Sequence, residues 1–232
     1  MEQWTYFKNL ATLFEEHGYH LYMVGGSTRD FLLHKESDDL DLTTNATPEE
    51  MLTFLKDAQT TFMHFGTLRL STFFGHVDIT TFRSEKGYED YRHPTEVEFV
   101  RELDIDAKRR DFTMNAIYID LNQNILDPFN GQEDLAKGMI KTIGDPYVRF
   151  KEDPLRILRA VRFAMLLHFE IEEETKLAMM KEKDLILNMN PQKVEEEIRK
   201  MKKISSKEYL SFLEKYELLD VLSPVLKKIE KN

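Results

Sequence analysis

The sequence predicts an α+β protein: a front part of mixed helices and short strands, followed by an all-helical back part. Three observations carry this prediction. Runs with strand character occur only before Gly131, Gly and Pro become sparse after it, and apolar residues then recur at helical spacing to the end. We therefore expect a first domain over 1–130 and a second, helical domain over 131–232.

Helices and strands alternate in the front part. Apolar side chains at helical spacing predict a helix over 4–16. The run 21–26 (LYMVGG) is typical of a short buried strand that ends in two glycines. The chain then turns helical at 27–33, where Ser27 is a suitable N-cap. The other expected elements are a strand at 40–44, a helix after Thr47, a hairpin of 67–74 with 76–82, and a second hairpin over 116–129 that turns at 122–124.

Composition excludes several classes of protein. The chain has no Cys, which excludes disulfides, thiolate zinc sites and a cysteine nucleophile. No apolar run approaches the ~20 residues that a membrane helix needs, and the N-terminus does not resemble a signal peptide. We therefore expect a soluble, cytoplasmic protein without a membrane partner. The sequence indicates no oligomeric state.

The distribution of charge leaves a nucleic-acid partner open. A net charge of -10 argues against one, because phosphates attract Lys and Arg. However, residues 1–116 hold 12 basic and 21 acidic side chains, whereas 117–232 hold 20 and 21. The acidic charge is thus concentrated in the front half, and the back half is nearly neutral. This asymmetry is typical of chains that bind nucleic acid at one end.

A glycine pair and two aspartates form the first candidate site. Gly25-Gly26 ends a strand and opens a helix, which lets the backbone approach a phosphate. Asp39 and Asp41 are two apart on a strand, so both carboxylates point to one face, ~7 Å apart along the chain. Like charges so placed repel unless a cation lies between them, and two hard oxygen ligands suit Mg²⁺.

Asp78 adds a third acid, because it interrupts a hydrophobic strand where a surface role is unexpected. The alternative is a polar turn at Ser37-Asp38-Asp39 with Asp41 facing solvent. Leu40 and Leu42 alternate with the acids and favour a strand with one buried face.

Arginines form two further candidate sites. Arg109-Arg110 suits an anion such as a triphosphate, although a solvated loop explains the pair equally well. Arg156, Arg159 and Arg162 step by three along one helix and would repel one another without an anion to face. The N-cap role explains Asp153, which precedes Pro154. The histidines show no metal-ligand spacing, and the runs 172–174 and 195–197 are expected to be solvated helix faces.

Together these residues resemble the class II tRNA nucleotidyltransferases, the bacterial CCA-adding enzymes of the polymerase β superfamily. The matching motifs, in the family's order, are VGGSTRD with DLD, VEFV, RRDFTMNAI and IGDPYVRFKEDPLRILRAVRFA, within 23–164. The resemblance implies a polymerase-β-like head with a small mixed sheet over 1–130, followed by a helical neck and the start of the body over 131–232. Because full-length relatives are longer, we expect a head-and-neck fragment or a naturally minimal form.

The resemblance also implies roles for individual residues. Asp39 and Asp41 become Mg²⁺ ligands. The expectation that Asp78 is a third catalytic acid rests on its place in a hydrophobic strand and not on the resemblance. Incoming ATP or CTP would be contacted by the head residues Gly26, Arg29 and Arg110 and by the neck residues Asp153, Arg156, Arg159 and Arg162.

The activity that the resemblance implies is the addition of C and A to the 3′ end of tRNA from CTP and ATP, with release of pyrophosphate. Within the family, the alternatives are a specialised A-adding enzyme and a poly(A) polymerase. A catalytically weak nucleotide- or RNA-binding fragment is the alternative of another class. The charged stretch 84–96 is the expected loop, and with Gly87 as hinge it would switch the enzyme from C to A.

Overall fold

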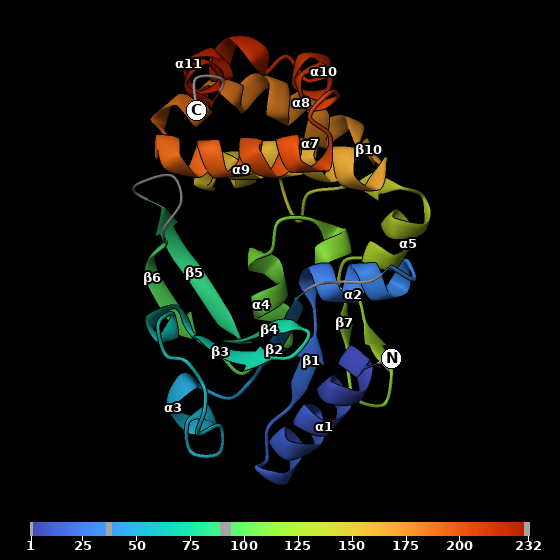
Figure 1. Ribbon diagram of the computed structural model, residues 1–232, viewed down its shortest axis with the longest axis vertical. Helices are drawn as coiled ribbons and strands as arrows, with labels where there is room; N and C mark the ends of the chain where they lie inside the picture. The colour runs from blue at the N-terminus through green and yellow to red at the C-terminus, as the bar shows by residue number, and fades with distance from the viewer. Residues whose placement is uncertain (1, 36–38, 89–93, 230–232) are drawn as a thin grey trace. The chain divides into compact units, whose positions relative to one another are not determined.

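Figure 1 shows the computed structural model of the chain, which describes residues 2–35, 39–88 and 94–229. The chain divides into two compact units. The first consists of Met1–Glu85 and Glu96–Gln132, and the second of Lys86–Thr95 and Glu133–Asn232. The functional division into a catalytic head over 1–130 and a helical neck over 131–232 stays a prediction.

A six-stranded mixed sheet forms the centre of the first unit (Figure 1). Its strands lie in the order β3-β4-β2-β1-β7-β8. β2 and β4 run parallel, and the other neighbouring pairs are antiparallel. The strands are β1 (Leu21–Met23), β2 (Leu40–Thr44), β3 (Thr67–Thr72), β4 (Gly75–Thr81), β7 (Tyr118–Ile119) and β8 (Ile125–Leu126).

One face of this sheet is covered by α1 (Glu2–Glu16). Phe7, Leu10 and Phe14 recur at helical spacing and pack in one cluster with Leu40 and Leu42 of β2. The helix expected over 4–16 is thereby confirmed. The unit's other elements are α2 (Gly25–Leu32), α3 (Pro48–Met51), α4 (Leu103–Arg109), η1 (Met63–Phe65) and η2 (Thr113–Asn115). The boundary between the units falls within α5 (Gly131–Ala136).

The second unit is mainly helical, and α7 (Leu155–Leu167) is its most buried helix. The expectation that no strand follows Gly131 is wrong, because β9 (Met139–Ile140) pairs in parallel with β10 (Glu170–Ile171). Two-residue strands are too short to show alternation. The other elements are α6 (Pro146–Glu152), α8 (Glu173–Glu182), η3 (Lys183–Asn188), α9 (Pro191–Ile204), α10 (Tyr209–Lys215) and α11 (Leu219–Ile229).

The expected loop at 84–96 is in part a hairpin. β5 (Arg83–Tyr88) and β6 (Pro94–Phe99) pair as a two-stranded sheet, so 84–88 and 94–96 are strand and not loop. Gly87, the expected hinge, lies within β5 and has a φ of 64°, a conformation that favours glycine. The remaining loop positions, 89–93, lie outside the described residues.

The expected strand at 40–44, the helix after Thr47 and both hairpins of the front part are confirmed. Thr47 caps α3 through a capping box with Glu50. No helix among the described residues is long and apolar enough to cross a membrane.

The space around Gly131 shows how tightly the first unit is packed. A Cβ at this position would lie 2.2 Å from the Thr113 carbonyl oxygen and 2.9 Å from Ile117 Cγ1. Backbone must therefore move to admit a methyl group, and we expect Gly131→Ala to lower the free energy of unfolding by about 1–3 kcal/mol. Urea denaturation measures this loss. Gln132→Ala, at the exposed neighbour, is the control, and an equal effect of both substitutions would contradict the packing.

Candidate active site

Asp39 and Asp41 lie at the beginning of β2, beside the turn between β1 and α2. Both side chains reach the surface, whereas Leu40 and Leu42 are buried in the core. This alternation is that of a strand with one covered face. The polar turn considered as the alternative includes Ser37 and Asp38, which lie outside the described residues.

Ser27 ties the two aspartates to α2. Its hydroxyl donates to the Asp39 carbonyl oxygen over 3.2 Å and accepts from the Asp41 N–H over 2.7 Å. The expectation that Ser27 is an N-cap is wrong, since α2 begins at Gly25 and its N-cap is Val24. The hydroxyl instead holds β2 against the first turn of the helix.

Gly25 and Gly26 do not end the strand as expected, because β1 ends at Met23 and the two glycines open α2. This first part of the helix, called the glycine turn below, faces the carboxylate of Asp41. Gly25 has a φ of 68°, which explains the need for glycine there. A Cβ at Gly25 would lie 3.5 Å from Asp41 Oδ2 and 3.9 Å from Arg110 Nη1. One at Gly26 would lie 3.6 Å from the same oxygen and 3.7 Å from Arg29 Nη2. One carboxylate and two guanidinium groups therefore converge on this turn.

The charges around Asp41 are crowded. Although its side chain reaches the surface, surrounding protein atoms remove water from the carboxylate and raise the pKa of Asp41. The guanidinium of Arg110 lowers this pKa, the carboxylates of Asp78 and Asp39 raise it, and Arg29 lowers it slightly. Carboxylates held this close to one another are suited to a cation, and their oxygens are the donors that divalent cations prefer.

Asp78 lies beside Asp41 but has a partner of its own. The parallel register of β2 and β4 sets Asp41 opposite Asp78, and the antiparallel register of β3 and β4 sets Arg69 opposite Asp78. Arg69 binds both carboxylate oxygens of Asp78, over 2.6 and 2.7 Å. The role of Asp78 as a third catalytic acid stays a prediction. No group of three or more His, Cys, Asp or Glu in the described part of the chain is arranged to hold a metal.

Arg29 is buried and bound on two sides. Its Nε and Nη2 donate to Asp30 over 2.9 and 2.7 Å, and its Nη1 donates to Asn115 Oδ1 over 3.1 Å. Asn115 in turn donates to Asp111 over 2.9 Å. The RRDFTMNA motif therefore contacts the helix that follows the glycine turn, and the two motifs form one site.

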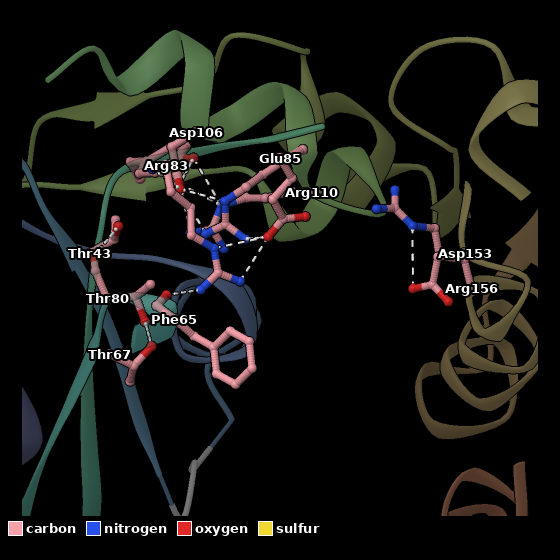
Figure 2. Close-up of polar contacts among 12 residues, drawn as sticks. Thr43, Phe65, Thr67, Thr80, Arg83, Glu85, Asp106, Arg110, Asp153 and Arg156 are labelled. Atoms are coloured by element: carbon pink, nitrogen blue, oxygen red, sulfur yellow. Dashed lines mark hydrogen bonds and ion pairs between the residues drawn. The ribbon is translucent and has the colours of Figure 1, made fainter. Parts of the chain in front are cut away.

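Arg110 reaches the turn from a buried group of polar side chains, of which Figure 2 labels Asp106, Arg83 and Glu85. Asp106 accepts from Arg110, from Arg109 and from the Tyr118 hydroxyl. Burial alone would raise the pKa of Asp106, but the charges of Arg109 and Arg110 outweigh it and lower this pKa to about 2. The i,i+4 spacing of Asp106 and Arg110 in the sequence signals this pair, whereas nothing in the sequence indicates Tyr118.

The second unit holds the other four predicted site residues on or next to α7. Asp153 ends α6, accepts from the Leu155 N–H over 3.1 Å and lies 3.8 Å from Arg156 Nε (Figure 2). The N-cap of α7 is Pro154 and not Asp153, so the helix begins one residue later than expected. Arg156 is nearly buried, 5% exposed.

Arg162 has a counter-ion that the sequence did not indicate. Glu197 on α9 is 3% exposed and accepts from Arg162 Nε over 2.8 Å. Burial alone would raise the pKa of Glu197, but the charges of Arg162 and Lys200 outweigh it and lower this pKa. Arg159 adds a smaller lowering. The expectation that 195–197 forms a solvated face is therefore wrong for Glu197. Repulsion along the arginine stripe is offset by a buried carboxylate, so it does not by itself require a bound anion.

Comparison with known proteins identifies the family. Residues 21–141 match the poly A polymerase head domain. The chain belongs to this family. A CCA-adding enzyme of Lactobacillus helveticus is 45% identical over 192 residues, which are 83% of this chain and 48% of that protein. One of a Geobacillus species is 42% identical over 187 residues, which are 81% and 46%.

Solved structures agree. The Bacillus stearothermophilus CCA-adding enzyme in complex with CTP superimposes with a TM-score of 0.79 at 33% identity, over 91% of this chain and 51% of that one. The Thermotoga maritima CCA-adding enzyme complexed with tRNA superimposes with a TM-score of 0.75 at 26% identity, over 95% and 52%. The predicted resemblance and α+β fold class are confirmed. The chain spans about half the length of the curated relatives it matches.

The low pKa of Asp106 predicts how stability depends on pH. A carboxyl whose pKa is near 2 in the folded state and ~3.9 when unfolded stabilises the fold above pH ~3.9 and loses this effect as pH falls toward 2. We expect the difference in unfolding free energy between the natural protein and Asp106→Asn to shrink by about 2–3 kcal/mol from pH 5 to pH 2. Urea denaturation at a series of pH values measures it.

Asp104→Asn, an exposed position on the same helix, is the control for this series. As a substitution at the surface, it should change the unfolding free energy by no more than about 0.5 kcal/mol. A constant difference for Asp106→Asn across the range would show that Asp106 titrates alike in both states.

Proposed function

We propose that the protein to which this chain belongs adds C and A to the 3′ end of tRNA, using CTP and ATP and releasing pyrophosphate. The observation that carries the proposal is the convergence of Asp41, Arg29 and Arg110 on the Gly25–Gly26 turn. Related proteins support it, because one similar structure holds CTP and another, a tRNA nucleotidyltransferase, holds a primer tRNA and an ATP analog.

Asp39 and Asp41 would hold Mg²⁺. Their carboxylate oxygens are hard donors. Burial raises the pKa of Asp41, the charges of Asp78 and Asp39 raise it further, and a cation would relieve this crowding of carboxylates. Mg²⁺, when bound, would neutralise charge on the triphosphate and make the terminal 3′-hydroxyl of tRNA easier to deprotonate. Ser27 would hold these ligands in place, because its hydroxyl binds the backbone of Asp39 and of Asp41, on either side of Leu40.

The guanidinium groups of Arg29 and Arg110 would bind the triphosphate. Guanidinium groups present planar forks of N–H donors that match phosphate oxygens. Gly26 lies in the first turn of α2, at the positive end of the helix dipole. Because glycine has no side chain, the backbone N–H groups there stay accessible to a phosphate. Charge on the triphosphate and on the departing pyrophosphate would thus be balanced by residues of the first unit.

Asp153 and Arg156 would select the base, with Arg159 and Arg162 as further contacts to the nucleotide. The ion pair of Asp153 and Arg156 sets an acceptor beside a donor. Cytosine and adenine each offer an amino donor beside a ring-nitrogen acceptor, which complements this pair. Uracil and guanine present the reverse pattern and would set oxygen against carboxylate.

Primer extension with the full-length protein tests the function. A tRNA that lacks its last three nucleotides should gain C, C and A with CTP and ATP, and nothing with UTP or GTP alone. Addition of A only, to a tRNA that already ends in CC, would identify a specialised A-adding enzyme. Binding of nucleotide without any extension would identify a catalytically weak nucleotide-binding protein and refute the proposal.

Asp39→Ala and Asp41→Ala should each reduce incorporation of both nucleotides at least about a hundredfold, because metal-based stabilisation contributes several kcal/mol. The rate of primer extension measures the loss, and circular dichroism checks that the fold is intact. Asp57→Ala is the matched control, since Asp57 is an exposed aspartate of the same unit. Near-normal turnover by either site variant would refute the metal ligands.

Asp153→Ala should reduce the preference for CTP and ATP over UTP and GTP by roughly ten- to a hundredfold, the value of one bidentate base contact. Ratios of incorporation measure it. Asp145→Ala is the matched control, because Asp145 also accepts from backbone N–H groups at a helix start, that of α6. Asp145→Ala should leave the ratios of incorporation unchanged. If Asp153→Ala is slower but also leaves these ratios unchanged, Asp153 has only a structural role.

A further inference from the structure

Asp106 and Tyr118 form a buried polar group behind Arg110. Both are fully buried, at 0% exposure, on α4 and β7 of the first unit. A carboxylate in such a place is destabilising unless cations and hydrogen-bond donors surround it. The side chains nearest to Gly25 and Gly26 are those of Asp41, Arg110 and Arg29, and the proposed chemistry uses neither Asp106 nor Tyr118 directly.

The two oxygens of Asp106 have different partners. Oδ1 accepts from Arg109 Nε over 2.8 Å and from the Arg83 N–H over 3.4 Å. Arg109 and Arg83 also contact Glu85, over 3.3 and 2.9 Å, so this side joins α4 to the beginning of β5. The contacts of Oδ1 therefore serve the architecture of the unit.

Oδ2 binds Arg110. It accepts from Arg110 Nε over 3.2 Å, from Nη2 over 3.0 Å and from the Tyr118 hydroxyl over 3.0 Å. The same hydroxyl accepts from Arg110 Nε over 2.9 Å. Tyr118 gives its single proton to Asp106 and uses a lone pair for Arg110, so the three side chains form a closed triangle (Figure 2 shows Asp106 and Arg110).

This triangle fixes one edge of the guanidinium of Arg110. The Nε and Nη2 edge is bound, and the remaining nitrogen, Nη1, lies beside the glycine turn and Asp41. A long arginine side chain otherwise samples many rotamers, and a ligand must then supply the free energy of ordering it. Anchoring on one edge removes that cost before any ligand arrives.

We infer that Asp106 and Tyr118 are positioning residues that hold Arg110 in the orientation in which it binds the triphosphate of the incoming nucleotide. The inference rests on the proposed function, which makes Arg110 a triphosphate contact. A substitution of Tyr118 can distinguish the positioning of Arg110 from the architecture of the unit. In the described hydrogen bonds, its hydroxyl contacts Asp106 Oδ2 and Arg110 but neither Asp106 Oδ1 nor Arg109.

Tyr118→Phe in the full-length protein tests the inference. The ring stays in the core while the hydroxyl is lost, so the KM for CTP and ATP should rise about ten- to a hundredfold, the effect of one hydrogen bond to a charged group. The kcat should change less than about twofold, because binding of ground and transition states weakens alike. Asp106→Asn should raise KM as well and also lower the melting temperature.

A double-mutant cycle distinguishes positioning from a general structural role. In an Arg110→Ala background, Tyr118→Phe should no longer change KM, because the residue it orients is gone. A structural role would raise KM by the same factor in both backgrounds. Tyr22→Phe is the matched control, because its ring lies 6.3 Å from that of Tyr118 while the described contacts of Asp106 do not include it; its KM should equal that of the natural protein.

The outcomes separate this inference from the proposed function. If the natural protein incorporates neither nucleotide, the proposed function fails and the inference falls with it. If the natural protein is active and Tyr118→Phe leaves KM unchanged, or raises it equally in the Arg110→Ala background, the inference alone is overturned. A rise in KM that vanishes in that background supports it.

Discussion

Asp106 carries a negative charge that water does not reach, and the geometry of the candidate site depends on how this charge is balanced. Two arginines and a tyrosine hydroxyl surround it. Because both arginines follow within four residues, one short segment brings cation and anion into the core together. The chain beyond it supplies Asn115, which binds Arg29. Residues 106–115 thus set both guanidinium groups next to Asp41.

The charges at the edge of β2 and β4 are arranged differently from those around Asp106. Asp39, Asp41 and Asp78 gather there on adjacent strands, and Arg69 neutralises only the last of them by a two-point contact. The charge that remains near Asp41 is of both signs, carboxylate from the sheet and guanidinium from the helices. Such a place is suited to a ligand that also carries both signs, a polyphosphate with its divalent cation.

In the second unit, too, cations surround a buried carboxylate. Glu197 is buried on α9 and accepts from Arg162 on α7 and from Lys200 on its own helix. Arg159 and Arg162 also lie over the ring of Phe163, at 5.4 and 4.4 Å from its centroid. The arginine stripe is therefore oriented by protein groups, as Arg110 is in the first unit. In both units, buried carboxylates orient the cations that are proposed to contact the nucleotide.

The fold class, the helix that covers the sheet, the main strands and the motifs of the site could be predicted from the sequence, because periodicity and short motifs are local properties of the chain. It did not indicate β9 and β10, which are too short to alternate, and it placed Ser27 at a helix cap because the competing partner, Asp41, is distant along the chain. Three pairings became visible in the folded protein alone: Arg69 pairs with Asp78, Tyr118 completes the contacts of Asp106, and Glu197 meets Arg162 from 35 positions away. These interactions act through space, so strand register and helix packing must exist before the partners can meet.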